Sequence, residues 1–436
     1  MTQPTYPDLL PIQPLESPPD TVIAVPGSKS ITNRALILAA LAEGRSALRG
    51  ALFSDDTRVM IGALRRLGFD VEAEEASEKI SVGGQGGRIP ATEAGLFTGN
   101  SGTSIRFLTA LTALGRGRYR LDGTERMRQR PQGDLLEALQ SLGVTAVSEA
   151  GNGCPPIRIE SAEGLRGGTV RLRAEASSQF LTALLMVAPY ASSDLTMEVV
   201  GPLRPFYVEI TRRMMAQWGV QAEVQESHRF AVPAGQRYAP QPEYAIEPDA
   251  SSASYFFAAA ALTGGRVSVP GLGPNALQGD VRFATEVLAA MGCEVTHDTR
   301  GLTVTGPVVG RLRGIDRDMS AISDTSLTLA ALAPFADSPT TVRNIAHTRL
   351  QECDRIAAAC AELARLGVRV EEHSDGLTVY PADTIRPAVV ETYKDHRVAM
   401  SFALIGLKVP GVVIRDPGCV AKTFPDYWQR LERLRT

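Results

Sequence analysis

The sequence is poor in the features that mark several classes of protein. Its five cysteines are scattered and form no CxxC pair, so we predict no disulfide framework, no zinc site and a reducing, cytoplasmic compartment. No apolar run approaches the roughly 18 residues that span a bilayer, and the first 20 residues lack the basic and apolar regions of a secretory signal. Lys and Arg number 45 against 48 Asp and Glu, which argues against a generally basic nucleic-acid binder.

What remains is an ordinary globular composition. The chain has 436 residues, of which 44% are hydrophobic and 21% charged. At roughly 150 residues per domain, this length predicts two or three domains. Because the net charge is only −3, any anion site must gather its positive charge locally.

One sequence pattern recurs along the chain: an amphipathic helix that ends at a glycine and is followed by a short strand-like run. The glycines are Gly68, Gly143, Gly219, Gly292 and Gly367, spaced by 75, 76, 73 and 75 residues. A glycine after the last helical turn is the usual left-handed cap, and alternation of apolar residues after it indicates a strand.

A second sequence pattern, a helix rich in Ala, Leu, Ser and Thr, repeats at positions between the copies of the first. Its six copies begin at spacings of 71, 76, 74, 73 and 71 residues, at Ser30, Ser101, Ser177, Ser251, Asp324 and Asp395. We predict that these weakly amphipathic helices are buried and that the glycine-capped helices, which carry Glu and Arg, are the outer ones.

The last repeat lacks its strand, and we predict that the N-terminal segment LLPIQPL (9–15) supplies it. The two ends of the chain then share one domain, and the chain crosses between domains twice, near 25–27 and 244–248. The predicted domains are residues 1–27 plus 246–436, and residues 28–245, with three repeats each.

Charged and polar side chains gather at the predicted helix starts, where free N–H groups and the helix dipole favour anions. If the starts converge, one site holds the cations Lys29, Arg34, Arg130, Arg355, Arg397 and Lys422. Only Asp324 and Glu352 are expected to oppose them. Such a set fits one or two small ligands that carry phosphate and carboxylate groups, and the absence of interleaved aromatic residues does not fit a nucleic-acid duplex.

These motifs resemble the 5-enolpyruvylshikimate-3-phosphate (EPSP) synthase family. The matching segments run from residue 26 to residue 428, and the most specific are GNSGT, RPQG and DHR. The resemblance implies an α/β fold: a two-domain inside-out α/β barrel of six βαβαββ repeats, three per domain, with the active site in the interdomain cleft. It also implies transfer of the enolpyruvyl group of phosphoenolpyruvate to the 5-hydroxyl of shikimate 3-phosphate, with release of phosphate and without a metal or cofactor.

The resemblance further assigns roles to individual residues. For shikimate 3-phosphate it implies contacts from Lys29, Ser30, Arg34, Ser177, Ser178, Gln179, Arg204, Tyr207, Asp324, His347 and Gln351. For phosphoenolpyruvate it implies contacts from Lys29, Asn100, Gly102, Arg130, Gln179, Arg355, Arg397 and Lys422. The catalytic residues it implies are Asp324 as proton acceptor, Glu352 as proton donor to the methylene carbon, Lys29 and His396.

Four positions depart from the family's pattern. Gln351 stands where many members have Lys, and His347 where many have Asn. Arg204 stands where Ser is frequent, and our hypothesis is that its charge replaces the missing Lys. The fourth position is Phe107, where some members have Pro. Gly102 predicts that glyphosate inhibits the protein, and Phe107 leaves the strength of this inhibition open.

Two other readings compete. The sister family that uses UDP-N-acetylglucosamine typically has Asn after the first Lys and a reactive Cys on a mobile loop, whereas here Ser30 follows Lys29 and residues 115–127 contain no Cys. The other reading, a non-catalytic repeat scaffold that binds anions, has little use for Asp324 and Glu352. We therefore expect a cytoplasmic, monomeric transferase of the shikimate pathway with small-molecule substrates and no nucleic-acid or membrane partner.

Overall fold

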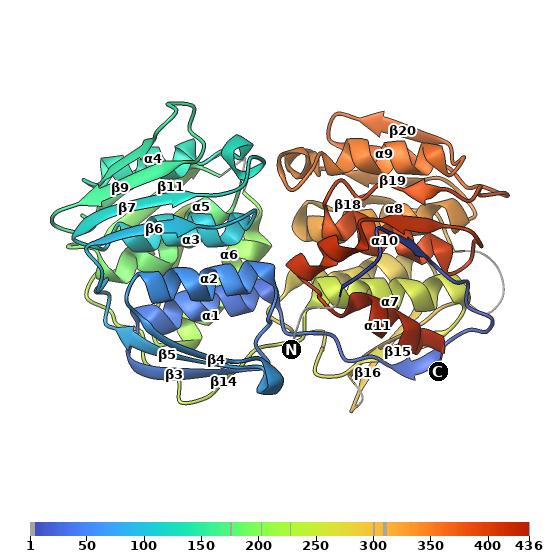
Figure 1. Ribbon diagram of the computed structural model, residues 1–436, viewed down its shortest axis with the longest axis horizontal. Coiled ribbons are helices and arrows are strands. Elements are labelled where there is room, and N and C mark those ends of the chain that lie inside the picture. The colour runs from blue at the N-terminus through green and yellow to red at the C-terminus, as the bar shows by residue number, and fades with distance from the viewer. Residues whose placement is uncertain are drawn as a thin grey trace. The chain divides into compact units, whose positions relative to one another are not determined.

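The computed structural model describes residues 5–174, 177–201, 203–226, 228–299, 301–307 and 312–435. The backbone divides into two compact units (Figure 1). Unit 1 comprises the chain up to Pro26 together with Glu247 onward, and unit 2 is Gly27–Ile246. Both ends of the chain therefore belong to unit 1.

Unit 2 contains twelve strands and six α-helices among its described residues. The strands are β3 (Glu43–Arg49), β4 (Asp70–Glu74), β5 (Lys79–Gln85), β6 (Glu93–Phe97), β7 (Gly117–Asp122), β8 (Thr145–Ser148), β9 (Ile157–Ser161), β10 (Gly168–Arg173), β11 (Leu195–Val200), β12 (Glu223–Glu226), β13 (Arg229–Val232) and β14 (Tyr244–Ala245). The helices are α1 (Lys29–Leu41), α2 (Asp55–Arg66), α3 (Gly102–Thr112), α4 (Gly133–Ser141), α5 (Gln179–Val187) and α6 (Pro205–Gln217), with short turns η1 (Glu75–Ser77), η2 (Met127–Gln129) and η3 (Ala188–Tyr190).

Unit 1 is built from the same kinds of element. Its described strands are β1 (Leu9–Pro11), β2 (Asp20–Val22), β15 (Arg266–Val269), β16 (Glu294–Asp298), β17 (Gly301–Thr305), β18 (Asp316–Asp318), β19 (Thr340–Arg343), β20 (Val370–His373), β21 (Gly376–Val379), β22 (Val389–Val390) and β23 (Val413–Arg415). Its described α-helices are α7 (Ala250–Thr263), α8 (Ser326–Leu332), α9 (Arg355–Arg365), α10 (His396–Gly406) and α11 (Tyr427–Glu432). It also has the π-helix η5 (Phe283–Leu288) and the 3₁₀ helices η4 (Gly279–Val281), η6 (Ser320–Thr325), η7 (Ala333–Phe335), η8 (Ala346–Leu350), η9 (Pro417–Lys422) and η10 (Arg433–Arg435).

The described strands form six small sheets that share one pairing order: a parallel pair, then antiparallel neighbours. In unit 2 the orders are β14-β3-β5-β4, β6-β7-β9-β8 and β10-β11-β13-β12. In unit 1 they are β2-β15-β17-β16, β18-β19-β21-β20 and β22-β23-β1. The fold is therefore mixed α/β, with helices packed on each small sheet.

The N-terminal segment completes the last sheet, as predicted. Strand β1 pairs antiparallel with β23, with Leu10 opposite Ile414. The Tyr6 hydroxyl donates to the Pro425 carbonyl at 2.9 Å, so a second contact ties the start of the chain to its end.

The predicted glycine caps are confirmed. Gly68, Gly143, Gly219, Gly292 and Gly367 have φ angles of 88°, 85°, 88°, 101° and 78°. Only glycine adopts this left-handed backbone without a steric penalty, so each glycine lets the chain leave its helix and turn into the next strand.

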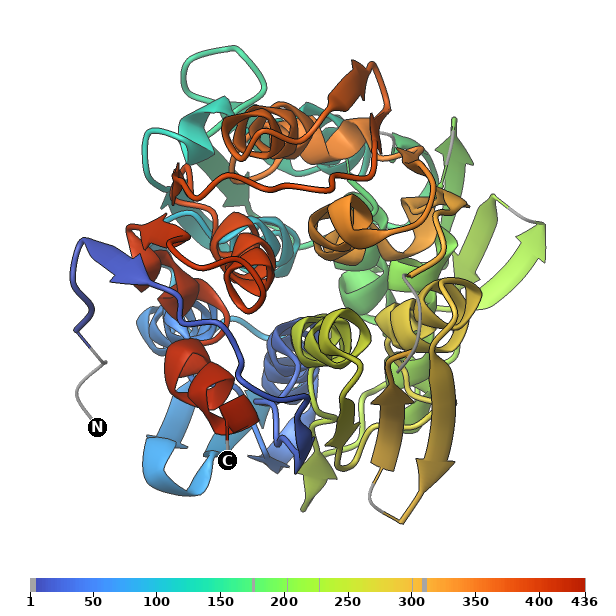
Figure 2. The same ribbon diagram turned by 90° about the vertical axis from the view of Figure 1, so that its right-hand side faces the viewer.

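The predicted difference between buried and outer helices is also confirmed. All 11 residues of α3 and all 11 of α10 are buried, whereas α2 keeps Asp55, Arg65 and Arg66 at its exposed surface. In unit 1, α7, α8 and α10 pack against one another and appear nearly end-on in Figure 2. Complete burial of each Leu, Ile or Phe stabilises the fold by about 1.5–3 kcal/mol, so these helices form the two cores.

Candidate active site

In unit 2, the starts of three helices meet around Asp56. The Lys29 ammonium at the start of α1 lies 3.5 Å from the Asp56 carboxylate in the first turn of α2. The Ser104 hydroxyl in the first turn of α3 donates to the Asp56 carbonyl oxygen at 3.2 Å. Asp56 is a partner of Lys29 that the sequence did not reveal, since an acidic residue in a first helical turn is common for dipole reasons alone.

The start of α3 holds the phosphoenolpyruvate residues predicted in GNSGT beside Arg130. The Arg130 guanidinium is buried and donates to the Asn100 carbonyl oxygen at 3.1 Å. A Cβ added to Gly102 would lie 2.5 Å from Arg130 Nη2. The missing side chain of Gly102 is therefore what leaves room for the guanidinium over the helix start.

Arg106 joins α3 to α5 and was missed by the sequence analysis. Its guanidinium donates to Gln179 Oε1 at 2.7 Å and to Ser177 Oγ at 3.2 Å. The Gln179 amide in turn donates to Thr103 Oγ1 at 3.1 Å. Arg106 lies one helical turn after Gly102, and this i, i+4 spacing is the signal that points it toward the helix start.

Arg34 is held inside unit 2 by three bonds. It donates to Thr211 Oγ1 at 2.8 Å, to the Ser30 carbonyl at 2.9 Å and to the Tyr207 carbonyl at 3.1 Å. Its guanidinium also stacks on the Phe107 ring at 5.4 Å. Burial lowers the pKa of Arg34 to about 10, so the group stays charged at neutral pH.

The remaining predicted residues of unit 2 lie on α5 and α6. Ser178 directly precedes α5 and is buried, as is its neighbour Ser177. Arg204 directly precedes α6, which begins with Pro205, and Tyr207 lies in the first turn of that helix. The α6 start meets α1 through the Arg34 bonds to Tyr207 and Thr211.

In unit 1, the predicted residues form a chain of alternating charges. Lys422 lies 2.6 Å from Glu352, and Glu352 lies 2.9 Å from Arg355. Arg355 lies 3.4 Å from Asp324, which lies 2.7 Å from Arg397. Three cations and two carboxylates from four separate segments are thus brought into direct contact.

Asp395 is a further carboxylate of this cluster. It accepts from Arg355 Nε at 2.8 Å, and it caps α10 by accepting from the Arg397 backbone N–H at 2.9 Å. The expectation that only Asp324 and Glu352 oppose the cations is therefore wrong, because Asp395 and Asp56 oppose them too. A helix cap looks the same in sequence whether or not its carboxylate also binds an arginine.

The carboxylates keep both arginines charged. Burial alone would lower the pKa of Arg355, but Asp395 and then Glu352 raise it above the ordinary range. Burial likewise opposes the charge on Arg397, and Asp324 raises the pKa of Arg397 well above its ordinary value. Both guanidiniums are therefore permanent cations.

Asp280, on η4, was not predicted and lies beside this cluster. It is 5% exposed, and its Oδ1 atom has no hydrogen-bond partner among the described residues. Burial first, and then the charge of Asp324, raise the pKa of Asp280 to about 7, while Arg397 lowers it. Asp280 therefore has a pKa near neutral, unlike an ordinary carboxyl, and the charge of Asp324 is one of the causes.

The other predicted residues of unit 1 border the same cluster. Gln351 accepts a bond from Arg355, and His347 shares a 2.9 Å hydrogen bond with Ser323 next to Asp324. His396 is buried, with its Nδ1 atom 3.5 Å from the Asp395 carboxylate.

The chemistry of both sets is that of anion binding with acid–base groups. Within the described ranges, no group of three or more His, Cys, Asp or Glu side chains is arranged to hold a metal ion. In the same part of the chain, no helix combines the length and hydropathy that crossing a membrane requires.

Comparison with known proteins gives one consistent result. The family profile described as EPSP synthase (3-phosphoshikimate 1-carboxyvinyltransferase) matches residues 16–431. The 3-phosphoshikimate 1-carboxyvinyltransferase of Nostoc punctiforme is 51% identical over 428 residues, which cover 98% of this chain and 99% of the relative. The chloroplastic 3-phosphoshikimate 1-carboxyvinyltransferase of Brassica napus is 46% identical and covers 95% of this chain and 83% of its own.

The fold has solved counterparts. The EPSP synthase of Acinetobacter baumannii superimposes with a TM-score of 0.81 over 98% of each chain, at 24% sequence identity. The structural match shows the fold, and the sequence matches, which extend over nearly the whole chain, show the family as well. The chain belongs to the EPSP synthase family of 3-phosphoshikimate 1-carboxyvinyltransferases.

Proposed function

We propose that this chain transfers the enolpyruvyl group of phosphoenolpyruvate to the 5-hydroxyl of shikimate 3-phosphate and releases phosphate. The observation that carries the proposal is the cluster of Asp324 and Glu352 with Arg355, Arg397 and Lys422, in a chain of this family. It combines permanent cations for anionic substrates with carboxylates that can move protons.

We propose that units 1 and 2 are the two domains, residues 1–27 plus 246–436 and residues 28–245, of an inside-out α/β barrel with six βαβαββ repeats. The pairing order shared by the described sheets, three in each unit, supports this reading. The substrates then bind in the cleft between the domains, so that each unit contributes its cluster of helix starts.

For shikimate 3-phosphate, the proposed contacts come mostly from unit 2. Ser177, Ser178 and Gln179 surround the 3-phosphate with two hydroxyls and an amide, next to Arg106. The binding set otherwise comprises Lys29, Ser30, Arg34, Arg204, Tyr207, Asp324, His347 and Gln351. Because Arg34 is already pinned by three bonds, a carboxylate meets it in a fixed orientation.

For phosphoenolpyruvate, Arg130, Lys422 and Lys29 provide the proposed charges for the phosphate, with Asn100, Gly102 and Gln179 beside them. Arg355 and Arg397 hold the carboxylate. Guanidinium groups suit this role because their planar donors match a carboxylate in a bidentate way.

In the proposed reaction, the 5-hydroxyl oxygen bonds to C2 of phosphoenolpyruvate while Asp324 accepts the hydroxyl proton. Glu352 delivers a proton to C3, which gives a tetrahedral intermediate. Phosphate then leaves C2 while the Glu352 carboxylate takes a proton back from C3, and the double bond is restored.

The ion pairs of Glu352 support its proposed role as an acid. Lys422 and Arg355 stabilise the ionised form of Glu352 in the free protein. When an anionic substrate binds those two cations, its charge offsets theirs and favours the protonated form of Glu352. Lys29 and His396 complete the proposed catalytic set.

Phosphate release tests the proposal. With phosphoenolpyruvate and shikimate 3-phosphate, the protein should release phosphate at a rate proportional to the enzyme concentration. With UDP-N-acetylglucosamine as the acceptor, it should release none. Turnover with the nucleotide sugar alone would favour the sister activity, and turnover with neither acceptor would favour a non-catalytic binder.

Three finer properties belong to the same proposal. We propose a monomer in the cytoplasm, in keeping with five cysteines that are all free. We also propose inhibition by glyphosate in competition with phosphoenolpyruvate, since Gly102 has no side chain that would displace the Arg130 guanidinium.

A further inference from the structure

A cavity of about 750 Å³ lies in unit 2 at the end of the core opposite to the candidate site. Its lining includes Glu43 just after α1, Leu114 just after α3, and Tyr190 at the end of η3, which continues α5. The candidate residues Lys29, Gly102 and Gln179 begin the same helices. Since α1 has 13 residues, the two places are separated by about 20 Å at 1.5 Å per residue.

Three arginines from separate segments line this cavity. Arg88 follows β5 in the glycine-rich run GGQGGR, Arg116 follows α3, and Arg237 follows β13. The side chains of Arg88 and Arg116 make no hydrogen bond or ion pair with any residue that the structure describes. Both arginines are exposed and line the cavity.

The third arginine is held in place. Arg237 stacks on the Tyr190 ring at 5.2 Å and donates to the Gly86 carbonyl at 3.2 Å. The Tyr190 hydroxyl donates to the Leu41 carbonyl at the end of α1. Gly87 packs so closely on the Tyr190 ring that an added Cβ would be 2.1 Å from it. The Tyr190 ring, the loop that contains Gly86 and Gly87, and the Arg237 guanidinium therefore pack together on one side of the cavity.

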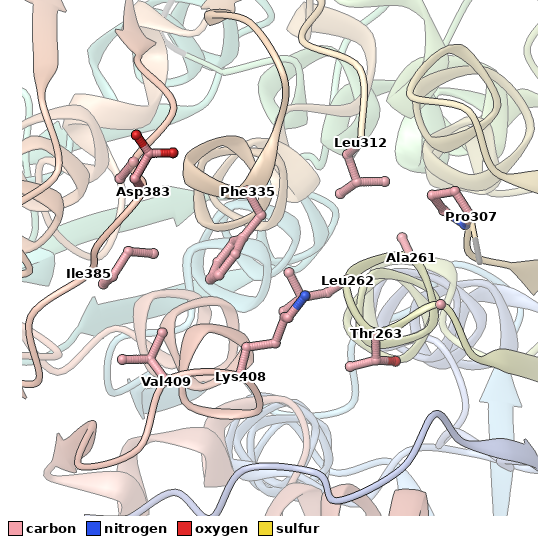
Figure 3. Close-up of a pocket in the computed structure, with 12 residues that line it drawn as sticks. Ala261, Leu262, Thr263, Pro307, Leu312, Phe335, Asp383, Ile385, Lys408 and Val409 are labelled. Atoms are coloured by element: carbon pink, nitrogen blue, oxygen red, sulfur yellow. The ribbon is translucent and has the colours of Figure 1, made fainter. Parts of the chain in front are cut away.

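Helix dipoles do not by themselves explain three arginines. The C-terminal end of a helix carries partial negative charge and attracts cations. Unit 1 has a cavity of about 360 Å³ at the corresponding ends of α7, η7 and α10 (Figure 3), and among its described lining residues the single cation is Lys408 and the single carboxylate is Asp383. There Lys408 lies over the Phe335 ring at 5.8 Å.

The carboxylates around the unit 2 cavity leave a positive balance. Glu163 is ion-paired with Arg166 at 3.3 Å, which leaves Glu43 as the lining carboxylate that opposes the three arginines. Guanidinium groups bind oxyanions through paired N–H donors, and several together favour a ligand with more than one negative charge.

We propose that this cavity binds a small multivalent oxyanion, of the size of a diphosphate or larger. Arg88, Arg116 and Arg237 are its ligands, and Glu43 weakens binding. The site is separate from the proposed active site, and the proposal does not depend on the proposed function.

Titration calorimetry of the full chain with pyrophosphate tests the proposal, with tricarballylate as a second probe that separates phosphate from carboxylate recognition. The double variant Arg88→Gln, Arg116→Gln should weaken binding at least tenfold. Glu43→Gln should tighten it about threefold, because removal of one facing charge strengthens anion binding. The matched control is Arg118→Gln, since Arg118 is an exposed arginine two residues from Arg116 that does not line the cavity.

The outcomes are distinct. Unchanged pyrophosphate affinity in the double variant would assign the binding to another place and overturn the proposal, as would the absence of binding to the unaltered chain at millimolar pyrophosphate. Ser192→Glu, at the exposed rim, gives a second check that leaves the arginines in place, and it should weaken binding as well. Melting temperatures within 2 °C of that of the unaltered chain show that the variants fold.

Discussion

The buried Arg34 of unit 2 is held differently from the buried cations of unit 1. In unit 1, Lys422, Arg355 and Arg397 each lie within 3 Å of a carboxylate. In unit 2, the buried Arg34 donates to one hydroxyl and two carbonyl oxygens. Neutral partners orient a guanidinium without offsetting its charge, whereas carboxylates balance the charge and can exchange protons.

This difference suggests a division of work within the proposed reaction. Unit 2 supplies oriented donors for substrate anions, and unit 1 supplies the groups that move protons. Changes in unit 1 should therefore reduce turnover most, and changes in unit 2 should mainly weaken substrate binding.

The largest expected effect follows removal of the proton acceptor. Asp324→Asn should lower kcat by roughly 10²–10⁴, the usual contribution of a general base. Because the side chain is 22% exposed, the fold should survive. Steady-state phosphate release gives kcat and KM, and Asp318→Asn, on the nearby β18, is the control that should keep its turnover. Equal losses in both variants would contradict the assignment.

An intermediate effect is expected at the start of α3. Gly102→Ala should displace the Arg130 guanidinium and raise the KM for phosphoenolpyruvate about 10-fold, which corresponds to the loss of about 1.4 kcal/mol of binding. It should leave kcat within a factor of about three. The matched control is Gly62→Ala on α2, where an added Cβ meets nothing within 4 Å. A KM unchanged by Gly102→Ala would show that Arg130 does not bind this substrate.

The last expected effect concerns the pH dependence of stability and not turnover. The pKa of Asp280 is raised to about 7 by burial and by Asp324, from an ordinary 3.8. Its contribution to stability is therefore complete below about pH 4 and is lost as the pH rises toward 7. Asp280→Asn removes this dependence. The free energy of unfolding of the variant, relative to the unaltered chain, should rise by on the order of 2 kcal/mol between pH 5 and pH 7.

Urea unfolding at several pH values measures this difference. Asp249 and Arg397 also influence Asp280, but they are present in both proteins and largely cancel. Asp20→Asn, an exposed position on β2, should show no such trend. A flat difference across the pH range at Asp280 would mean that this carboxyl is ionised throughout.

Much of the fold could be predicted because its signals are local. The glycine caps at Gly68 and Gly367 need only a left-handed backbone, and the buried helices need only a run of small apolar residues. The pairing of β1 with β23 followed from counting strands in the repeats. Each of these features is encoded within a few neighbouring residues or in their spacing.

Many residues of the candidate site could be predicted from the sequence, but the side chains that each of them contacts could not. Sequence motifs indicated Arg355 and Asp324 as members, and the structure brings them within 3.4 Å of each other. It also brings Asp395 to Arg355 and Arg106 to Gln179, across 40 and 73 residues. Such pairs depend on which side chains face each other after packing, and no local pattern records that.

By itself, the sequence determined the repeat, the caps, the buried helices and the family. The tertiary structure alone decided which charges are paired, which line the unit 2 cavity, and which buried carboxyl has a raised pKa. The physical reason is distance: backbone conformation is set by neighbours along the chain, whereas electrostatic energy is set by neighbours in space.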